Sequence, residues 1–304
     1  AAARSARSPR PPACPPTMTK HGSQTPNDVP PRGEPATRRV LNVRLLIISL
    51  GAVAVLTLAA HFWKQHQLAR TAGAMLDRAE VLAQQGDLGA ASGYLYRYLQ
   101  LHPDEPRANR RLAELMLDGA QDVAARTRAA DVCYAALARL PVGERPALRA
   151  RLGQLLIELE RYGAAEKEAS LLAAEASELA GPEAQEKSLA ESKRLAALAA
   201  YGRIRTTGLA DAPEAAGLAR LFETALEASP GDVALATTLA RIWRDEPTLL
   251  APEDQQLAAA ERAARADQII DRMVAQCSEG VEGLLARAAS RIVHGQAGAE
   301  SDLR

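Results

Sequence analysis

The stretch QQGDLGAASGYLYRYLQLHPDEP, residues 84–106, gives the clearest indication of how this chain folds. Its centre, YLYRY at residues 94–98, alternates aromatic side chains with others, as a half-buried strand does. Four apolar residues are nevertheless spaced i, i+4, i+7 and i+8, so that they share one helical face: Ala91, Leu95, Tyr98 and Leu99. A Gly-Asp pair before them and Pro103 after them mark the ends of such a helix. We therefore predict a helix, and the tyrosine alternation is coincidental.

The residues around this helix fit a repeating unit of about 34 residues. A unit that ends shortly after Pro103 begins at Ala72, and it places the small residues Ala79 and Ala91 within its two helices. Gly86 falls in the turn between the helices. This pattern resembles the tetratricopeptide repeat, a helical hairpin in which small residues let neighbouring helices approach closely. The resemblance implies an all-α fold whose hairpins stack into a superhelix.

Two further units follow, with departures from the pattern. Residues 106–117 are predicted as a first helix and residues 127–140 as its partner, and extra residues in DGAQDVAART, 118–127, lengthen the turn between them. A third unit opens at Pro146, where RLGQLLIELERYGAAE, residues 151–166, gives the best local match in the chain.

The rest of the chain matches less regularly. ARLFETALEASPGDV, residues 219–233, has the expected spacing, and insertions lie near Thr206 and Pro247. Looser hairpins are expected around Leu195, Leu239 and Leu285. GQAGAESDLR, residues 295–304, reads as the start of a second helix that breaks off, so we expect a truncated C-terminus. The prediction is a TPR-like α-solenoid over residues 72–304; an Ala-rich bundle or coiled coil without true repeats is the alternative.

Composition favours helices over strands. Hydrophobic residues make up 47% of the chain but aromatic residues only 3%, and the apolar share is mostly Ala and Leu. Ala and Leu carry little penalty in a helix, whereas strands favour β-branched and aromatic residues. The predicted fold class is therefore all-α.

An uncharged apolar run precedes the repeats. Residues Leu45–Trp63 would span about 28 Å as a helix, which is close to the hydrocarbon thickness of a bilayer. We predict a transmembrane helix at 45–63, preceded by a disordered basic tail at 1–44 and followed by a juxtamembrane linker at 64–71. The alternatives are a buried core helix and the apolar part of a cleaved signal peptide.

Charge differs between the two ends of the chain. Residues 1–44 carry eight Lys/Arg and two Asp/Glu, whereas residues 71–304 carry 27 basic and 35 acidic side chains. The acidic repeats argue against a nucleic-acid partner, because phosphate binding needs a concentrated positive face. Basic residues slightly favour the N-terminal side of the apolar run, which predicts a cytoplasmic N-terminus and extracytoplasmic repeats. The Ala/Arg-rich, Lys-poor composition suggests a bacterial protein, and Met18 is a candidate initiator.

The sequence contains no catalytic or metal-binding pattern. Cys14, Cys133 and Cys277 are far apart, and Cys133 lies at a core position, where cysteine acts as a small hydrophobe. The five histidines do not cluster, and the carboxylates are interleaved with arginines as on solvated helix faces. We therefore expect no enzyme, no metal and no cofactor.

The resemblance implies a binding groove lined by the first helix of each unit. The family's groove positions correspond here to Arg107, Arg110 and Glu114 in the second unit and to Gln154, Ile157 and Glu158 in the third. Glu114 stands where family members that clamp a C-terminal carboxylate have Asn, so that clamp is not expected. Three arginines would attract an acidic segment: Arg107, Arg110 and Arg111. Alternatively they are solvated arginines paired with Asp104, Glu105 and Glu114.

Three functions fit these observations. The leading hypothesis is a single-pass, membrane-anchored scaffold that binds protein or peptide partners in the concave groove, with the bilayer crossed by Leu45–Trp63. The second is the N-terminal regulatory or sensory region of a longer enzyme or signalling protein whose catalytic domain lies beyond residue 304. The third is a cleaved, secreted solenoid.

Overall fold

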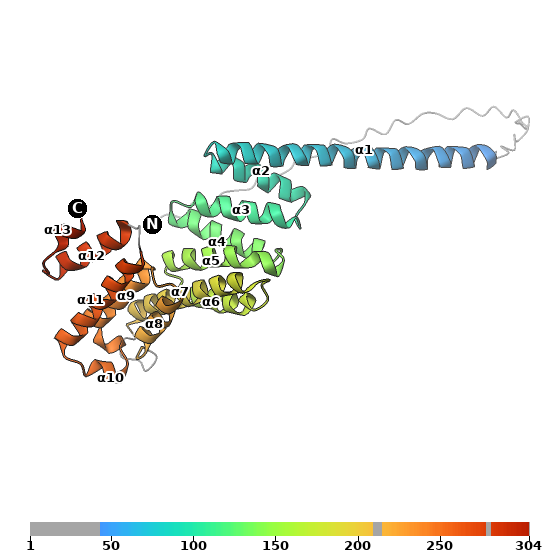
Figure 1. Cartoon of the computed structure of the whole chain (residues 1–304). Coiled ribbons are helices and arrows are strands. Elements are labelled where there is room, and N and C mark those ends of the chain that lie inside the picture. Colours follow the sequence, from blue (N-terminus) through green and yellow to red (C-terminus); the bar gives the residue numbers. More distant parts are fainter. Residues whose placement is uncertain (1–42, 209–214, 278–280, 304) are drawn as a thin grey trace, which may run out of the picture. The chain divides into compact units, whose positions relative to one another are not determined.

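The computed structural model describes residues 43–208, 215–277 and 281–303. The chain divides into two compact units, Ala1–Ala60 and His61–Arg304. Every regular element within the described residues is a helix, which confirms the predicted all-α class (Figure 1). The predicted tail at 1–44 lies almost entirely outside these residues.

Helix α1, Val43–Gln84, begins in the first unit and ends in the second. Its window Leu46–Trp63 has a mean hydropathy of 2.0 and no buried residue, so it is long and apolar enough to cross a bilayer. Residues 64–71, predicted as a linker, belong to the same helix. No proline interrupts residues 43–84, which agrees with one continuous helix.

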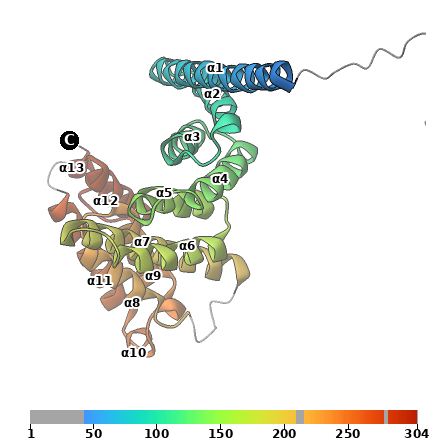
Figure 2. The same ribbon diagram turned by 90° about the vertical axis from the view of Figure 1, so that its right-hand side faces the viewer.

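The second unit consists of helical hairpins stacked in chain order (Figures 1 and 2). The end of α1 shares a buried cluster with α2, Leu88–Leu101, through Ala79, Leu82, Ala91 and Leu95. The hairpins that follow within the described residues are α3 (Pro106–Asp118) with α4 (Val123–Leu137), α5 (Arg145–Glu158) with α6 (Tyr162–Ala176), α7 (Pro182–Thr207) with α8 (Leu218–Ala228), α9 (Val233–Asp245) with α11 (Ala259–Gln276), and α12 (Val281–Val293) with α13 (Ala299–Asp302).

Successive first helices of these hairpins contact one another. Helix α3 contacts α5, α5 contacts α7, α7 contacts α9, and α9 contacts α12. An ion pair accompanies the junction of α3 with α5, where Arg151 lies 2.5 Å from Asp118, and another joins α3 to α1, where Arg111 lies 3.3 Å from Glu80. The first helices therefore form a continuous layer, which is the predicted α-solenoid architecture.

Small residues set the spacing between helices. Ala165 of α6 has no exposed surface. A β-carbon added to Gly153 of α5 would lie 2.7 Å from Cδ1 of Leu195, and one added to Gly202 of α7 would overlap the Tyr162 ring. The side chains of neighbouring hairpins thus occupy the space that a larger residue would need.

The second helix of the second hairpin differs from its prediction. Helix α4 runs from Val123 to Leu137 instead of over residues 127–140. Asp122 starts it, because the Asp122 side chain accepts a hydrogen bond from the Ala125 N–H at 2.6 Å. Residues 123–127, the last part of the stretch predicted to lengthen the turn, therefore belong to the start of the helix, and residues 119–122 remain between α3 and α4.

The later hairpins also depart from the expected pattern. The looser hairpin predicted around Leu195 is one helix of 26 residues, α7, which pairs with α8. The insertion predicted near Pro247 is present as a 3-10 turn, Pro247–Leu249, and the short helix α10, Pro252–Gln255. The helix predicted to start within residues 295–304 is α13.

Candidate functional site

The predicted groove residues of α3 are held mainly by neighbouring carboxylates. The Arg110 guanidinium donates to Glu114 at 2.9 Å and lies 3.9 Å from Glu144. Arg111, one residue on, lies 3.6 Å from Glu114 as well. Arg107 is exposed and forms no ion pair with any residue that the structure describes. Arg110 therefore matches the alternative of an arginine paired along its own helix, whereas Arg107 presents its charge to solvent.

The groove residue Gln154 of α5 belongs to a contact that joins three first helices. Its side-chain oxygen accepts a hydrogen bond from Arg194 of α7 at 3.2 Å. The same guanidinium donates to Asp232 at 2.7 Å, and Asp232 caps the N-terminus of α9 by accepting from the Leu235 N–H at 2.9 Å. Arg194 thus fixes α5, α7 and the start of α9 relative to one another.

The last two predicted groove residues face other surroundings. Ile157 is half-buried and lines a pocket of about 410 Å³ together with Tyr162 and Tyr201. The Glu158 carboxylate lies 3.7 Å from Arg126 of α4, a second helix. The six predicted residues are therefore spread along α3 and α5, and none of the contacts just described joins the set on α3 to the set on α5.

Tyr201 forms the polar edge of the Ile157 pocket. Its hydroxyl donates to Glu246 at 2.8 Å, and its ring packs edge-on against Phe222. Burial, and next the hydrogen bond to Glu246, raise the pKa of Tyr201, so the phenol is neutral at physiological pH. The pocket combines aromatic walls with a positive residue, because Arg205 also lines it.

A buried ionic cluster connects α5 to α6. Arg149 forms two hydrogen bonds with Glu175, at 2.9 and 2.8 Å, and a third with Glu168. The side chains of Arg149 and Glu168 are only 8% and 4% exposed, so this cluster holds the hairpin together and offers no binding surface. The sequence signal for it is the presence of charged residues at core-facing positions of both helices.

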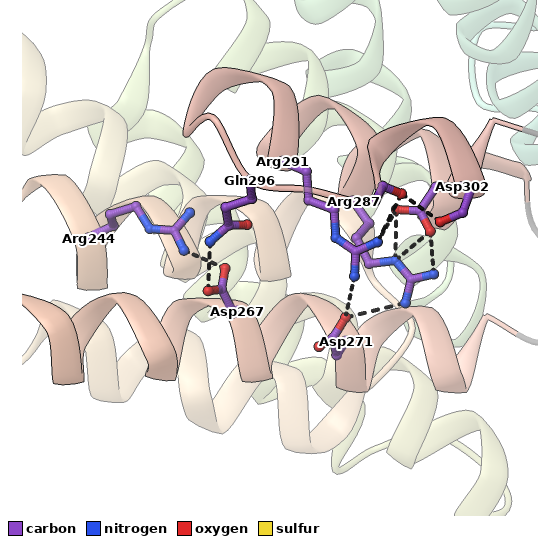
Figure 3. A network of polar contacts seen from close by, with 9 residues as sticks. Arg244, Asp267, Asp271, Arg287, Arg291, Gln296 and Asp302 are labelled. Atoms are coloured by element: carbon purple, nitrogen blue, oxygen red, sulfur yellow. Dashed lines mark hydrogen bonds and ion pairs between the residues drawn. The ribbon is translucent and has the colours of Figure 1, made fainter.

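A second ionic cluster fastens α13 to the end of the solenoid. Arg287 donates to Asp302 at 2.6 Å and Arg291 donates to it at 2.9 Å, while Arg287 also lies 3.3 Å from Asp271 of α11 (Figure 3). The hydrogen bond from Arg287 lowers the pKa of Asp302 below that of an ordinary aspartate, against the opposing effect of burial. In the same view Asp267 bridges Arg244 and Gln296.

The cysteines show no reactive arrangement. Cys133 is fully buried, and this burial raises the pKa of its thiol to about 12. Cys277 is half-buried, its thiol donating to the Gly231 carbonyl at 3.1 Å, and Cys14 lies outside the described residues. Within residues 43–208, 215–277 and 281–303, no three His, Cys, Asp or Glu side chains are arranged to hold a metal ion.

Comparison with known proteins finds a family match for one part of the chain. Residues 72–115 match the family described as Tetratricopeptide repeat. A solved structure described as "MamA RS-1 ArsTM double mutant" is similar over 68% of this chain and 97% of that chain, at 14% identity and a TM-score of 0.46. Among curated proteins no match is found.

Proposed function

We propose that this chain, whose residues 72–115 match the family described as Tetratricopeptide repeat, is a membrane-anchored scaffold that binds protein partners on the layer formed by its first helices. Tetratricopeptide repeats support a role in protein–protein interaction. Beyond this general role, we propose the membrane anchor, the extracytoplasmic location of the repeats and the residues of the binding face.

The observation that carries the proposal is the contact of each first helix with the next. This contact makes α3, α5, α7, α9 and α12 one extended surface instead of separate helices. Extended surfaces of this kind are what solenoids offer to partners. Arg107 and Gln154 lie on two adjacent members of this layer, and we assign them to the binding face together with Arg110, Glu114, Ile157 and Glu158.

The membrane anchor is supported by the exposure of the apolar part of α1. Within Leu46–Trp63 the side chains of Ile48, Leu50 and Trp63 are 70%, 71% and 69% exposed. Exposing such side chains to water is unfavourable, by about 25 cal/mol for each Å² of apolar surface, and a bilayer removes this cost. The excess of basic residues on the N-terminal side favours repeats on the extracytoplasmic side.

Extraction of membranes with alkaline carbonate tests the anchor. We expect the full chain to stay in the membrane pellet, whereas a form with Leu50 and Leu56 both changed to Arg should be released, because each charge is costly within the bilayer. A wild-type chain that moves to the supernatant would contradict the anchor.

Affinity isolation tests the binding face. The double variant Arg107→Glu, Glu158→Arg, which changes two exposed residues of the assigned face, should recover less partner protein from detergent-solubilised membranes than the wild type. The matched control is Arg128→Glu, Lys167→Glu, which changes exposed residues of the second helices α4 and α6. Equal recovery by the wild type and both variants would remove the assignment of the face.

A further inference from the structure

A groove of about 510 Å³ lies between the second helices α8 and α11. The α11 residues that line it recur at helical spacing from Arg265 to Gln276. This distance corresponds to about 16 Å, or three turns of helix. The groove is therefore elongated along α11, which suits a helical segment better than a compact small molecule.

The floor of the groove is apolar. Leu239 of α9 and Met273 of α11 are both 1% exposed, and Leu226 and Ile269 pack against the same core cluster. An occupant would therefore place an apolar stripe on this floor. The helix-in-groove mode of recognition uses such a stripe at i, i+3, i+4 and i+7.

The two walls carry opposite charges. Glu223 and Glu227 line the groove from α8, whereas Arg265 and Arg272 line it from α11. None of these four side chains forms an ion pair with another residue in the described part of the chain. Burial, opposed by the nearby Arg265, raises the pKa of Glu223, so this carboxylate would gain from an added positive partner.

Neighbouring contacts hold the walls in place. The Arg265 guanidinium lies 5.2 Å from the centre of the Trp243 ring, which fixes it beside the groove. Arg220 of α8 pairs with Glu253 of α10, so the insertion between α9 and α11 is fastened to the acidic wall. The groove is thus formed before any partner binds, which lowers the entropic cost of binding.

We propose that this groove binds an amphipathic helix of a partner protein whose apolar stripe is flanked by Lys or Arg on the side facing α8 and by Asp or Glu on the side facing α11. The charge arrangement selects this partner, because a helix with one sign of charge on both flanks would meet a like charge on one wall. Both walls of this groove belong to second helices, so the proposal does not depend on the residues of α3 and α5 assigned to the binding face above.

Three synthetic peptides test the proposal with the full chain in detergent micelles. Each forms about four helical turns with the same leucine stripe; one has Lys on one flank and Glu on the other, one has Lys on both flanks, and one has Glu on both. Fluorescence anisotropy should show that the wild type binds the mixed peptide about tenfold more tightly than either of the others.

Charge reversal of each wall then changes the preference. Glu227→Arg should favour the peptide with Glu on both flanks, and Arg272→Glu should favour the peptide with Lys on both. Glu227 and Arg272 are exposed, so both variants should have the melting temperature of the wild type. If charge reversal lowers the melting temperature, Arg272→Gln, which only removes the charge, tests the same wall.

Arg128→Glu and Arg107→Glu, outside the groove, are the controls and should keep the wild-type preference. Absence of saturable binding by all three peptides, or an unchanged preference in the wall variants, would overturn the proposal.

Discussion

Leu195 of α7 packs directly on Gly153 of α5, so closely that a β-carbon at Gly153 would lie 2.7 Å from Leu195 Cδ1. Both residues are buried, and Leu195 has no exposed surface. The junction between the third and fourth hairpins therefore depends on the absence of a side chain at one position. Because each hairpin buries its apolar face only against its neighbours, this contact affects the continuity of the whole layer of first helices.

Gly153→Val should lower the free energy of unfolding by about 1–3 kcal/mol, because the added side chain overlaps Leu195. Urea unfolding followed by far-UV circular dichroism measures this effect. Gly93→Ala in α2 is the matched control, since nothing lies within 4 Å of a β-carbon there. That variant should gain about 0.5–1 kcal/mol from its higher helix propensity. A Gly153→Val protein as stable as the wild type would show that the helices are not in close contact.

Arg149→Met should destabilise the third hairpin by about 3–5 kcal/mol, because it leaves the buried Glu168 carboxylate without its positive partner. Glu175 keeps Arg145, whose guanidinium lies 3.6 Å away. The double variant Arg149→Met, Glu168→Gln should therefore recover part of the loss, as thermal melting can measure. Equal melting temperatures for the single and double variants would show that Arg149→Met does not leave an unpaired charge at Glu168.

Protection of α13 from hydrogen exchange should persist from neutral pH to below pH 4. The pKa of Asp302 is lower in the folded state than the ordinary value of about 3.9, so its contribution is present above that value and is lost as the pH falls through the folded pKa. Asp302→Asn should weaken the protection of Ala299–Asp302 already at pH 7 and remove its dependence on acid. Protection that is lost between pH 7 and pH 5 in the wild type would contradict this assignment.

Cys133 should resist alkylation in the native protein at pH 8, because the raised pKa, about 12, leaves almost no thiolate and burial blocks access. Mass spectrometry after treatment with iodoacetamide should find Cys133 modified only in urea. Cys277, which is half-buried, serves as the comparison within the same chain and should react faster. Rapid native modification of Cys133 would indicate that the second hairpin opens locally.

The repeat architecture was predictable because its signals are local. Ala91, Gly153 and Ala165 recur with the turn residues of each hairpin, and they mark close helix contacts without reference to distant residues. The predicted start of α4 lies four residues too late, because Asp122 is an N-cap and not a residue of the turn. The hydrogen bond from the Ala125 N–H to the Asp122 side chain fixes where α4 begins.

The contacts of the predicted groove residues could not be predicted from local sequence signals. Arg194 reaches both Gln154 and Asp232, which belong to other hairpins, so the contact depends on the angle between stacked helices. The groove between α8 and α11 likewise requires residues of α8, α9 and α11 to come together. Helical spacing identifies the lining face of α11 but gives no information on what lies opposite.

Photo-crosslinking in native membranes distinguishes a binding face on the first helices from one on the second helices. Benzoylphenylalanine is placed at residue 107 or 154 on first helices, or at residue 128 or 167 on second helices. We expect a discrete adduct with a partner protein from positions 107 and 154 and none from positions 128 and 167. Adducts of equal yield from all four positions, or from the second-helix positions alone, would contradict a binding face formed by the first helices.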